Sequence, residues 1–215
     1  MQQQSNYSSI KISNWGSAVE NIRFRNKAIG GVIVFILIML LLPTFFATIE
    51  SRKGIVLDDW ILNQITPYDF SIPIFIIIWS TTILFIIRSI YDPVIFIEVI
   101  YSVVLLCIVR MISISLVPLD PPLGLIKLID PLTSLTYGGK DVFITKDLFF
   151  SGHTSNMFLL TLCFQRKTDK WIGFFAAISV GVLVLFQHVH YTIDVLAAFV
   201  ITYFLVIIGK RLAAH

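Results

Sequence analysis

The chain has 215 residues, a net charge of +3, and 57% hydrophobic against 13% charged residues. Ordinary soluble domains carry roughly 25% charged residues, so this composition excludes an ordinary soluble protein. Nucleic acid is excluded as a partner, because the chain has no basic run interleaved with aromatic residues of the kind that binds bases. We therefore expect an integral membrane protein.

Apolar runs of about 18 residues or more, the length of a membrane-spanning helix, recur along the chain. In chain order we find six: Ala28–Ile49, Ser71–Ile90, Pro93–Val117, Leu148–Phe164, Trp171–Gln187 and His190–Gly209. The connections between them are too short for a separate soluble domain. We predict an all-α integral membrane protein with one six-helix transmembrane bundle over residues 28–209. A polar cytoplasmic segment (1–27) precedes it and a short basic cytoplasmic tail (210–215) follows it.

The lysines and arginines outside the apolar runs divide unequally between the two faces, and an excess marks the cytoplasmic side. One face has ten: Lys11, Arg23, Arg25, Lys27, Arg88, Arg166, Lys167, Lys170, Lys210 and Arg211. The other has five, Arg52, Lys53, Lys127, Lys140 and Lys146, set against eight acidic residues. We therefore expect both termini in the cytoplasm. The loop Pro118–Asp147 and the starts of the fourth and sixth runs then lie on the opposite face, which is periplasmic, extracellular or lumenal.

Three ionisable residues stand where the fourth and sixth runs begin, a depth at which such groups are costly unless they are used or partnered. His190 and Asp194 are four residues apart, so they share one face of a helix. A carboxylate bonded to one imidazole nitrogen fixes the tautomer and prepares the other nitrogen to accept a proton or attack an electrophile. With His153 on the same face of the membrane, we predict a catalytic group of His153, His190 and Asp194.

The residues around His153 favour an anion. Ser151 and Gly152 precede it at a predicted helix start, where free backbone amides and the helix dipole attract phosphate. The hydroxyls of Ser151 and Thr154 can cap the helix or donate, and the glycine lets a ligand approach the main chain. Arg110, inside the third run, needs a carboxylate, carbonyls or a bound phosphate at that depth. Together these residues predict a phosphoryl-transfer site that requires no metal or other cofactor.

Other interpretations of the same residues stay open. Arg110 could pair structurally with Glu98, and the two histidines with Asp194 could hold zinc. We interpret His188 as a structural hydrogen-bonding residue, and Cys107 and Cys163 as small core residues without a ligand spacing. A lipid transporter or scaffold on the same bundle is the alternative to an enzyme.

The segments Phe150–Thr154 and His188–Val195 resemble the sphingomyelin synthase branch of the type 2 phosphatidic acid phosphatase (PAP2) superfamily. The resemblance covers roughly Tyr101–Gly209, including Leu106–Arg110 and the proline-rich loop Val117–Pro122. It implies a membrane phosphotransferase that moves a phospho-head group from a glycerophospholipid to a lipid alcohol such as ceramide or diacylglycerol, with these lipids as partners in the bilayer. By the same resemblance His190 is the nucleophile that forms a phosphohistidine, Asp194 orients it, and His153 protonates the departing alcohol.

Two departures from related patterns bear on the substrate. The lipid phosphatases of the superfamily carry an Arg-Pro element and a Ser-Arg pair before the second histidine motif, whereas this chain has Val184 six residues before His190 and no Arg-Pro pair. This disfavours a phosphomonoesterase, whose dianionic substrate needs several cations. In addition, Thr145–Asp147 stands where the synthases have Cys-Gly-Asp. A phosphatase or phospholipase C-type hydrolase of the superfamily, with water as acceptor, remains the alternative enzyme.

Overall fold

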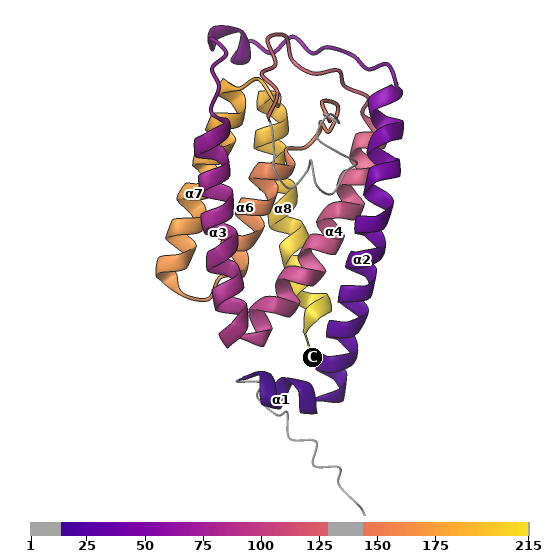
Figure 1. The fold of residues 1–215 in the computed structure, drawn as a ribbon, viewed down its shortest axis with the longest axis vertical. Helices are drawn as coiled ribbons and strands as arrows, with labels where there is room; N and C mark the ends of the chain where they lie inside the picture. The colour runs from indigo at the N-terminus through magenta and orange to yellow at the C-terminus, as the bar shows by residue number, and fades with distance from the viewer. Residues whose placement is uncertain (1–13, 129–143, 215) are drawn as a thin grey trace, which may run out of the picture.

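The computed structural model describes residues 14–128 and 144–214. Within them the chain is all-α, with seven α-helices and one short 3-10 turn, η1 (Leu62–Gln64) (Figure 1). The α-helices are α1 (Trp15–Glu20), α2 (Ile22–Ser51), α3 (Ser71–Tyr91), α4 (Pro93–Leu116), α6 (Gly152–Cys163), α7 (Lys167–Phe186) and α8 (Thr192–Ala213).

Local sequence signals explain where several helices begin. The side chain of Asn21 accepts hydrogen bonds from the Arg23 and Phe24 amides at the start of α2. Asp92 caps α4 in the same way, accepting from Val94 N at 2.9 Å, and Pro93 follows at the first helical position, where its missing N–H costs nothing. The charged residues near residue 27 and after Gly209 do not end the helices, since α2 begins at Ile22 and α8 continues to Ala213. The boundaries placed at residues 27 and 210 therefore mark a change in polarity rather than a change in structure.

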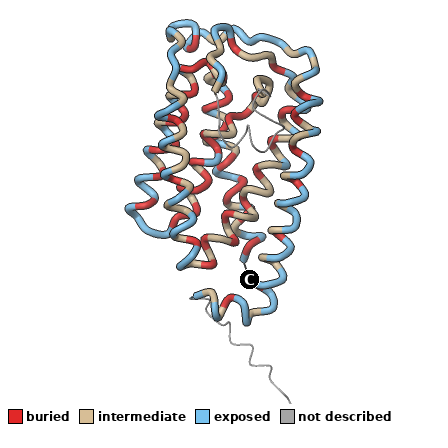
Figure 2. The backbone as a smooth tube through the Cα atoms, viewed as in Figure 1, coloured by how far each residue is buried: buried red, intermediate tan, exposed pale blue. Residues whose placement is uncertain are grey.

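Five helices, α2, α3, α4, α7 and α8, are long and apolar enough to cross a membrane. Their outer faces carry large apolar side chains, such as Leu40, which is 70% exposed, and Ile72, which is 74% exposed. Figure 2 shows exposed residues along the outer sides of α2 and α7 and buried residues concentrated toward the middle of the bundle. Apolar faces of this extent fit a hydrocarbon surrounding. The chain is a multi-pass integral membrane protein, as the composition predicts.

The fourth apolar run differs from the prediction. Helix α6 starts only at Gly152 and has 12 residues, about 18 Å at the usual helical rise, which is too short to cross a hydrocarbon core of about 30 Å. The preceding residues Leu148–Ser151 are non-helical, and Leu148, Phe150 and Ser151 are buried. Apolarity alone cannot tell a buried extended segment from a helix. The sequence therefore overestimates the length of the fourth helix.

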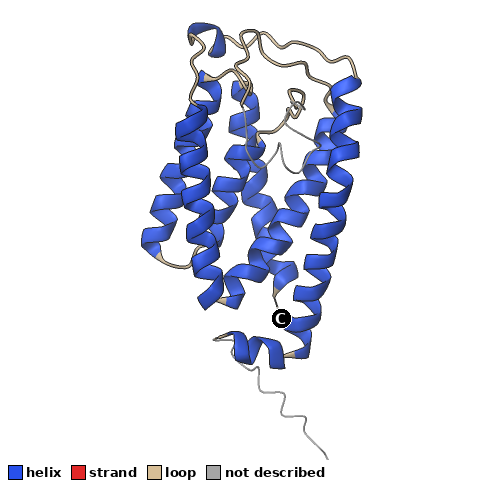
Figure 3. Ribbon diagram, in the orientation of Figure 1, coloured by secondary structure: helices blue, strands red, loops and turns tan. Residues whose placement is uncertain are grey.

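Both described ends of the chain lie at one end of the bundle (Figure 1). Trp15 Nε1 in α1 donates to Ser89 O near the end of α3, and Lys27 Nζ donates to Leu212 O in the last turn of α8, each at 2.9 Å. The long connections cross the opposite end (Figure 3). The two described ends of the chain thus share one end of the bundle, while the assignment of that end to the cytoplasm stays a prediction. Lys11 and Lys140 lie outside the described residues.

Close contact between α4 and α8 depends on a glycine. A β-carbon added at Gly209 would lie 2.4 Å from Ser102 Oγ and 2.9 Å from Ser102 Cα, so it would meet backbone that cannot move aside locally. Small residues allow helix backbones to approach in this way in membrane bundles. Gly30 in α2, by contrast, has nothing within 4 Å of the same position.

We expect Gly209→Ala to destabilise the protein by about 1–3 kcal/mol, because overpacking forces α4 and α8 apart. Gly30→Ala is the matched control and should leave stability unchanged or slightly raised, since alanine favours the helix. Unfolding in mixed detergent, followed by circular dichroism, measures both. Equal stability of the two variants would contradict the tight α4–α8 contact.

Candidate active site

The N-termini of α6 and α8 meet at the end of the bundle that carries the long loops. Ser151 N donates to Asp194 O at 3.1 Å, which ties the start of α6 to the first turn of α8. Ser151 is the N-cap of α6, and its Oγ accepts from Thr154 N at 3.4 Å and lies 3.1 Å from Thr154 Oγ1. Both hydroxyls are fully buried. The helix start that the sequence places before His153 is present.

His153 and His190 face one another across this junction. Their ring centroids are 6.4 Å apart with an interplanar angle of 61°. His190 is 2% exposed, whereas His153 in the first turn of α6 is partly exposed. The two imidazoles come from elements separated by the whole of α7, and a phosphorus centre between them could be reached from both sides.

Asp194 lies behind His190. Its Oδ2 is 3.4 Å from His190 Nδ1 and accepts from Tyr191 N at 3.1 Å, and the residue is fully buried. The imidazole contact is long for a hydrogen bond, as catalytic contacts often are before the substrate binds. With Nδ1 directed at the carboxylate, Nε2 is the nitrogen available to a substrate.

Arg110 reaches the start of α6 from the middle of the bundle. Its Nη2 lies 2.5 Å from Asp147 Oδ1, and its Nη1 donates to Phe150 O. A β-carbon at Gly152 would lie 2.9 Å from Arg110 Cζ, so the guanidinium rests directly against the glycine. The alternative pairing with Glu98 is wrong, because Glu98 pairs with Lys210 at 3.0 Å.

The extended segment before α6 is anchored along its length. Glu50 at the end of α2 accepts from Thr145 N at 3.0 Å and from Lys146 N at 3.1 Å. Ser113 Oγ, one turn after Arg110 in α4, donates to Phe149 O at 2.8 Å. Residues 144–151, which we call the strap, are therefore held by both α2 and α4, and the strap sets the position at which α6 begins.

Loops from two other parts of the chain attach to the second histidine motif. The ring nitrogens of His188 lie 2.7 Å from Leu123 O and 3.0 Å from Ile65 O. Its role is thus structural, as expected, although it joins loops rather than helices. Tyr191 Oη accepts from Leu57 N at 3.1 Å and donates to Asp120 O at 2.8 Å.

Asp59 caps α8 from the α2–α3 loop. Its two carboxylate oxygens accept from Thr192 N at 2.6 Å and from Thr192 Oγ1 at 3.0 Å. Burial raises the pKa of the Asp59 carboxyl, but the hydrogen bonds from Thr192 and Leu62 outweigh it and leave the pKa below its ordinary value. The depressed pKa means that the ionised carboxylate stabilises the fold above its unfolded-state pKa, and that this stabilisation is lost as the pH falls through the folded-state pKa.

The arrangement of the two histidines and Asp194 does not match a metal site. Among residues 14–128 and 144–214, no group of three His, Cys, Asp or Glu side chains is arranged to hold an ion. Asp194 is bonded to His190 itself rather than converging with it on a common point. The two cysteines, Cys107 and Cys163, are unpaired thiols on α4 and α6.

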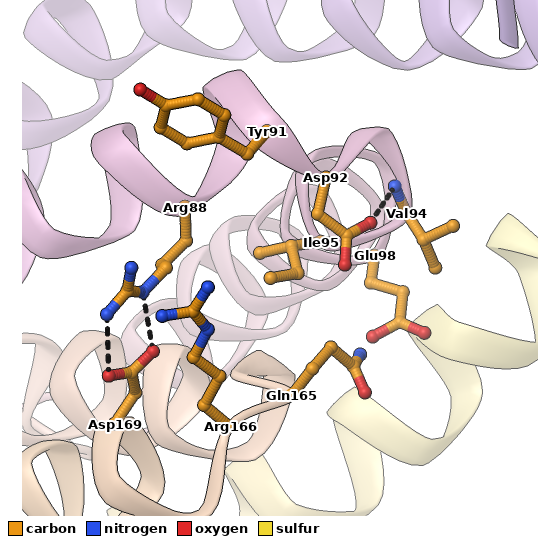
Figure 4. Close-up of a pocket in the computed structure, with 9 residues that line it drawn as sticks. All are labelled: Arg88, Tyr91, Asp92, Val94, Ile95, Glu98, Gln165, Arg166 and Asp169. Carbon is orange, nitrogen blue, oxygen red and sulfur yellow. Dashed lines mark hydrogen bonds and ion pairs between the residues drawn. The ribbon is translucent and has the colours of Figure 1, made fainter. Parts of the chain in front are cut away.

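A pocket of about 570 Å³ lies at the other end of the bundle. Two acidic residues of its wall are paired. Arg88 makes a two-bond contact with Asp169, at 2.6 and 3.1 Å (Figure 4). Glu98 pairs with Lys210. No histidine, serine, threonine or cysteine is among the residues that line it. The histidine site, not this pocket, carries groups suited to nucleophilic catalysis.

Sequence reasoning missed four polar residues that position the site: Glu50, Asp59, Asp147 and Tyr191. Each acts through a contact distant in sequence, from 37 residues for Arg110–Asp147 to 134 for Leu57–Tyr191. A pattern of residues that are close together in the sequence cannot reveal such contacts. Only Asp147 carried a signal, since it retains the aspartate of the synthase Cys-Gly-Asp element.

Comparison with known proteins supports a family for the C-terminal part of the chain. Residues 146–211 match the family model described as PAP2 superfamily C-terminal, a family that contains sphingomyelin synthase-like proteins. The match covers just under a third of the chain and includes the strap from Lys146, both histidines and Asp194. No curated protein and no solved structure matches. The match shows that residues 146–211 are similar to the C-terminal part of PAP2-superfamily proteins.

We expect Gly152→Ala to fold normally but to lose activity by roughly 10²-fold, because displacement of a positioning group by about 1 Å can cost that much. The added methyl meets the far end of the Arg110 side chain, which can move, rather than backbone. Turnover and thermal unfolding of the purified variant measure the two effects. Unchanged turnover would contradict a role for the Arg110 position in the reaction.

Proposed function

We propose that this protein transfers a phospho-head group from a glycerophospholipid to a lipid alcohol of the ceramide or diacylglycerol class. The observation that carries the proposal is the pair of facing imidazoles, His153 and His190, with Asp194 behind the second. The PAP2-superfamily match over residues 146–211 supports lipid phosphate as the substrate class. The resemblance of both histidine motifs to sphingomyelin synthases supports transfer to a lipid alcohol.

In the first step, His190 Nε2 attacks the phosphorus of the donor and the bond from phosphorus to the diacylglycerol oxygen breaks. His153 donates a proton to that oxygen, so diacylglycerol leaves as a neutral alcohol. Asp194 stabilises the positive charge that develops on the imidazole through its contact with Nδ1. The product is a phosphohistidine that still carries the head-group alcohol as its ester.

The anionic phosphate is held at the start of α6. The backbone amides of that first turn and the helix dipole favour negative charge, and Gly152 leaves the main chain accessible. Arg110 lies against the same glycine and supplies a guanidinium. Ser151 and Thr154 hold the helix start in place through their buried hydroxyls.

In the second step the acceptor alcohol takes the place of diacylglycerol. His153, now neutral, removes the proton from the acceptor hydroxyl as its oxygen attacks the phosphohistidine. The bond from phosphorus to His190 breaks, and the free imidazole is restored. Water in place of the lipid alcohol would make the enzyme a phospholipase C-type hydrolase, which is the alternative function. A transporter or scaffold would have no need of the imidazole pair.

The structure also bears on topology. Helix α6 and the strap together return the chain from the end where α4 finishes to the end where α7 begins. We therefore count them as one crossing, the fourth in chain order, which brings the total to six. With the ten-to-five division of cations, the active site then lies on the non-cytoplasmic face and both termini lie in the cytoplasm.

A donor labelled at phosphorus tests the mechanism, with a fluorescent ceramide or diacylglycerol as acceptor. We expect labelled acceptor lipid from the wild type and acid-labile label on the protein in a single turnover. His190→Ala should lose both, since no other group replaces the nucleophile. His153→Ala should still form some intermediate with a donor whose leaving group needs no proton, because general acid catalysis, worth roughly 10²–10⁴-fold, is then dispensable. Asp194→Asn should fall between the two.

Asp120→Asn is the matched control, because this carboxylate lies at the same end of the bundle and its side chain pairs with Lys146 rather than with an imidazole. It should keep both label and turnover. Label that persists in His190→Ala would assign the nucleophile elsewhere. Release of the free phospho-head group regardless of added lipid alcohol would identify a hydrolase.

A further inference from the structure

The charge at the start of α6 is set by a pair of residues rather than by a single arginine. Arg110 and Asp147 are joined at 2.5 Å, and their side chains are 10% and 29% exposed. The carboxylate is therefore the more accessible member of the pair. Because Arg110 also rests on Gly152, the Asp147 carboxylate lies beside the position where the phosphate would bind.

Neither Lys146 nor Arg52 pairs with this carboxylate. Lys146 pairs with Asp120 at 2.9 Å and also donates to Arg52 O. The guanidinium of Arg52 faces the carbonyl oxygens of Ser115 and Val117, at 3.3 and 3.5 Å. A phosphate at α6 thus meets a neutral Arg110–Asp147 pair, a helix dipole equivalent to about half a positive charge, and one positive charge on His153 in the protonated state that the proposed first step requires.

We propose that Asp147 makes the site selective for phosphate monoanions over dianions. A phosphodiester carries one negative charge, whereas a phosphomonoester carries nearly two at neutral pH, since its second pKa is about 6. Each additional negative charge within several ångströms of a carboxylate costs a sizeable Coulomb energy even at an intermediate dielectric. Asp147 therefore acts as a specificity determinant that admits phospholipid diesters and excludes lipid monoesters such as phosphatidic acid.

This inference rests on the proposed phosphate site and deepens it by assigning a residue to the choice of substrate. It also predicts what removal of the charge would allow. In Asp147→Asn a monoester could transfer its phosphoryl group to His190, with the proton from His153 going to the diacylglycerol oxygen. Water would then attack the phosphohistidine, release inorganic phosphate and restore the imidazole.

Equilibrium binding in the His190→Ala background tests the inference without turnover. The probes are a short-chain phosphatidic acid and its methyl ester, two lipids that differ by one methyl group and one negative charge. At pH 8 the protein that carries only His190→Ala should bind the methyl ester more tightly than phosphatidic acid, on the order of tenfold or more. Asp147→Asn should reduce the ratio to within about threefold, mainly through tighter binding of phosphatidic acid.

Two comparisons separate charge selectivity from a structural effect. Asparagine keeps an oxygen that can accept from Arg110, so the strap should stay in place, and a mere loss of structure would weaken both ligands alike. Asp58→Asn removes a carboxylate from the α2–α3 loop at the same end, where Asp58 accepts from Asn63 Nδ2 rather than pairing with a cation of the strap, and it should leave the ratio unchanged. Equal binding of the two lipids by the otherwise unchanged protein, or an unaltered ratio in Asp147→Asn, would overturn the inference. Because no chemistry is measured, either result would leave the phosphohistidine mechanism to its own test.

Discussion

A guanidinium inside an apolar bundle has to be partnered, and the partners of Arg110 determine how the active-site end is built. The strap provides them: the Asp147 carboxylate and the Phe150 carbonyl both lie on it. To reach Arg110, the strap must stay extended inside the bundle, and α6 cannot start before Gly152. An intramembrane arginine therefore explains both the short fourth helix and the location of an anion-favouring helix start deep in the protein.

The second half of the site depends on the first through one backbone contact. Ser151 N donates to Asp194 O, so the start of α6 fixes the first turn of α8, where His190 is held by Asp194. Loops on the outside strengthen the same turn, because Asp59 caps α8 and Tyr191 joins two loop segments. A nucleophile and a general acid must keep a fixed separation to act on one phosphorus, and this network of contacts supplies that rigidity.

Sequence reasoning succeeded where the chemistry is local. The His190–Asp194 contact and the Ser-Gly-His-Thr helix start are short-range features, and both are present in the structure, although His190 lies two residues before α8 rather than on a helix face. The prediction of the fourth helix failed because apolar residues occur in more than one kind of buried structure. Leu148 and Phe150 are as apolar as residues of the helices, but they are buried in the extended strap. Sequence reasoning also could not find Glu50 or Asp59, whose contacts join distant segments, or recognise that Arg110 pairs with Asp147 rather than with Glu98.

The proposed reaction consists of two displacements at phosphorus, the first by His190 and the second by a lipid alcohol. The stereochemistry of transfer measures this directly. A phosphatidylcholine with a single phosphorothioate configuration serves as donor, and the configuration of the product lipid is determined. Two in-line displacements predict retention of configuration. Inversion would show a single direct displacement and would contradict a phosphohistidine intermediate.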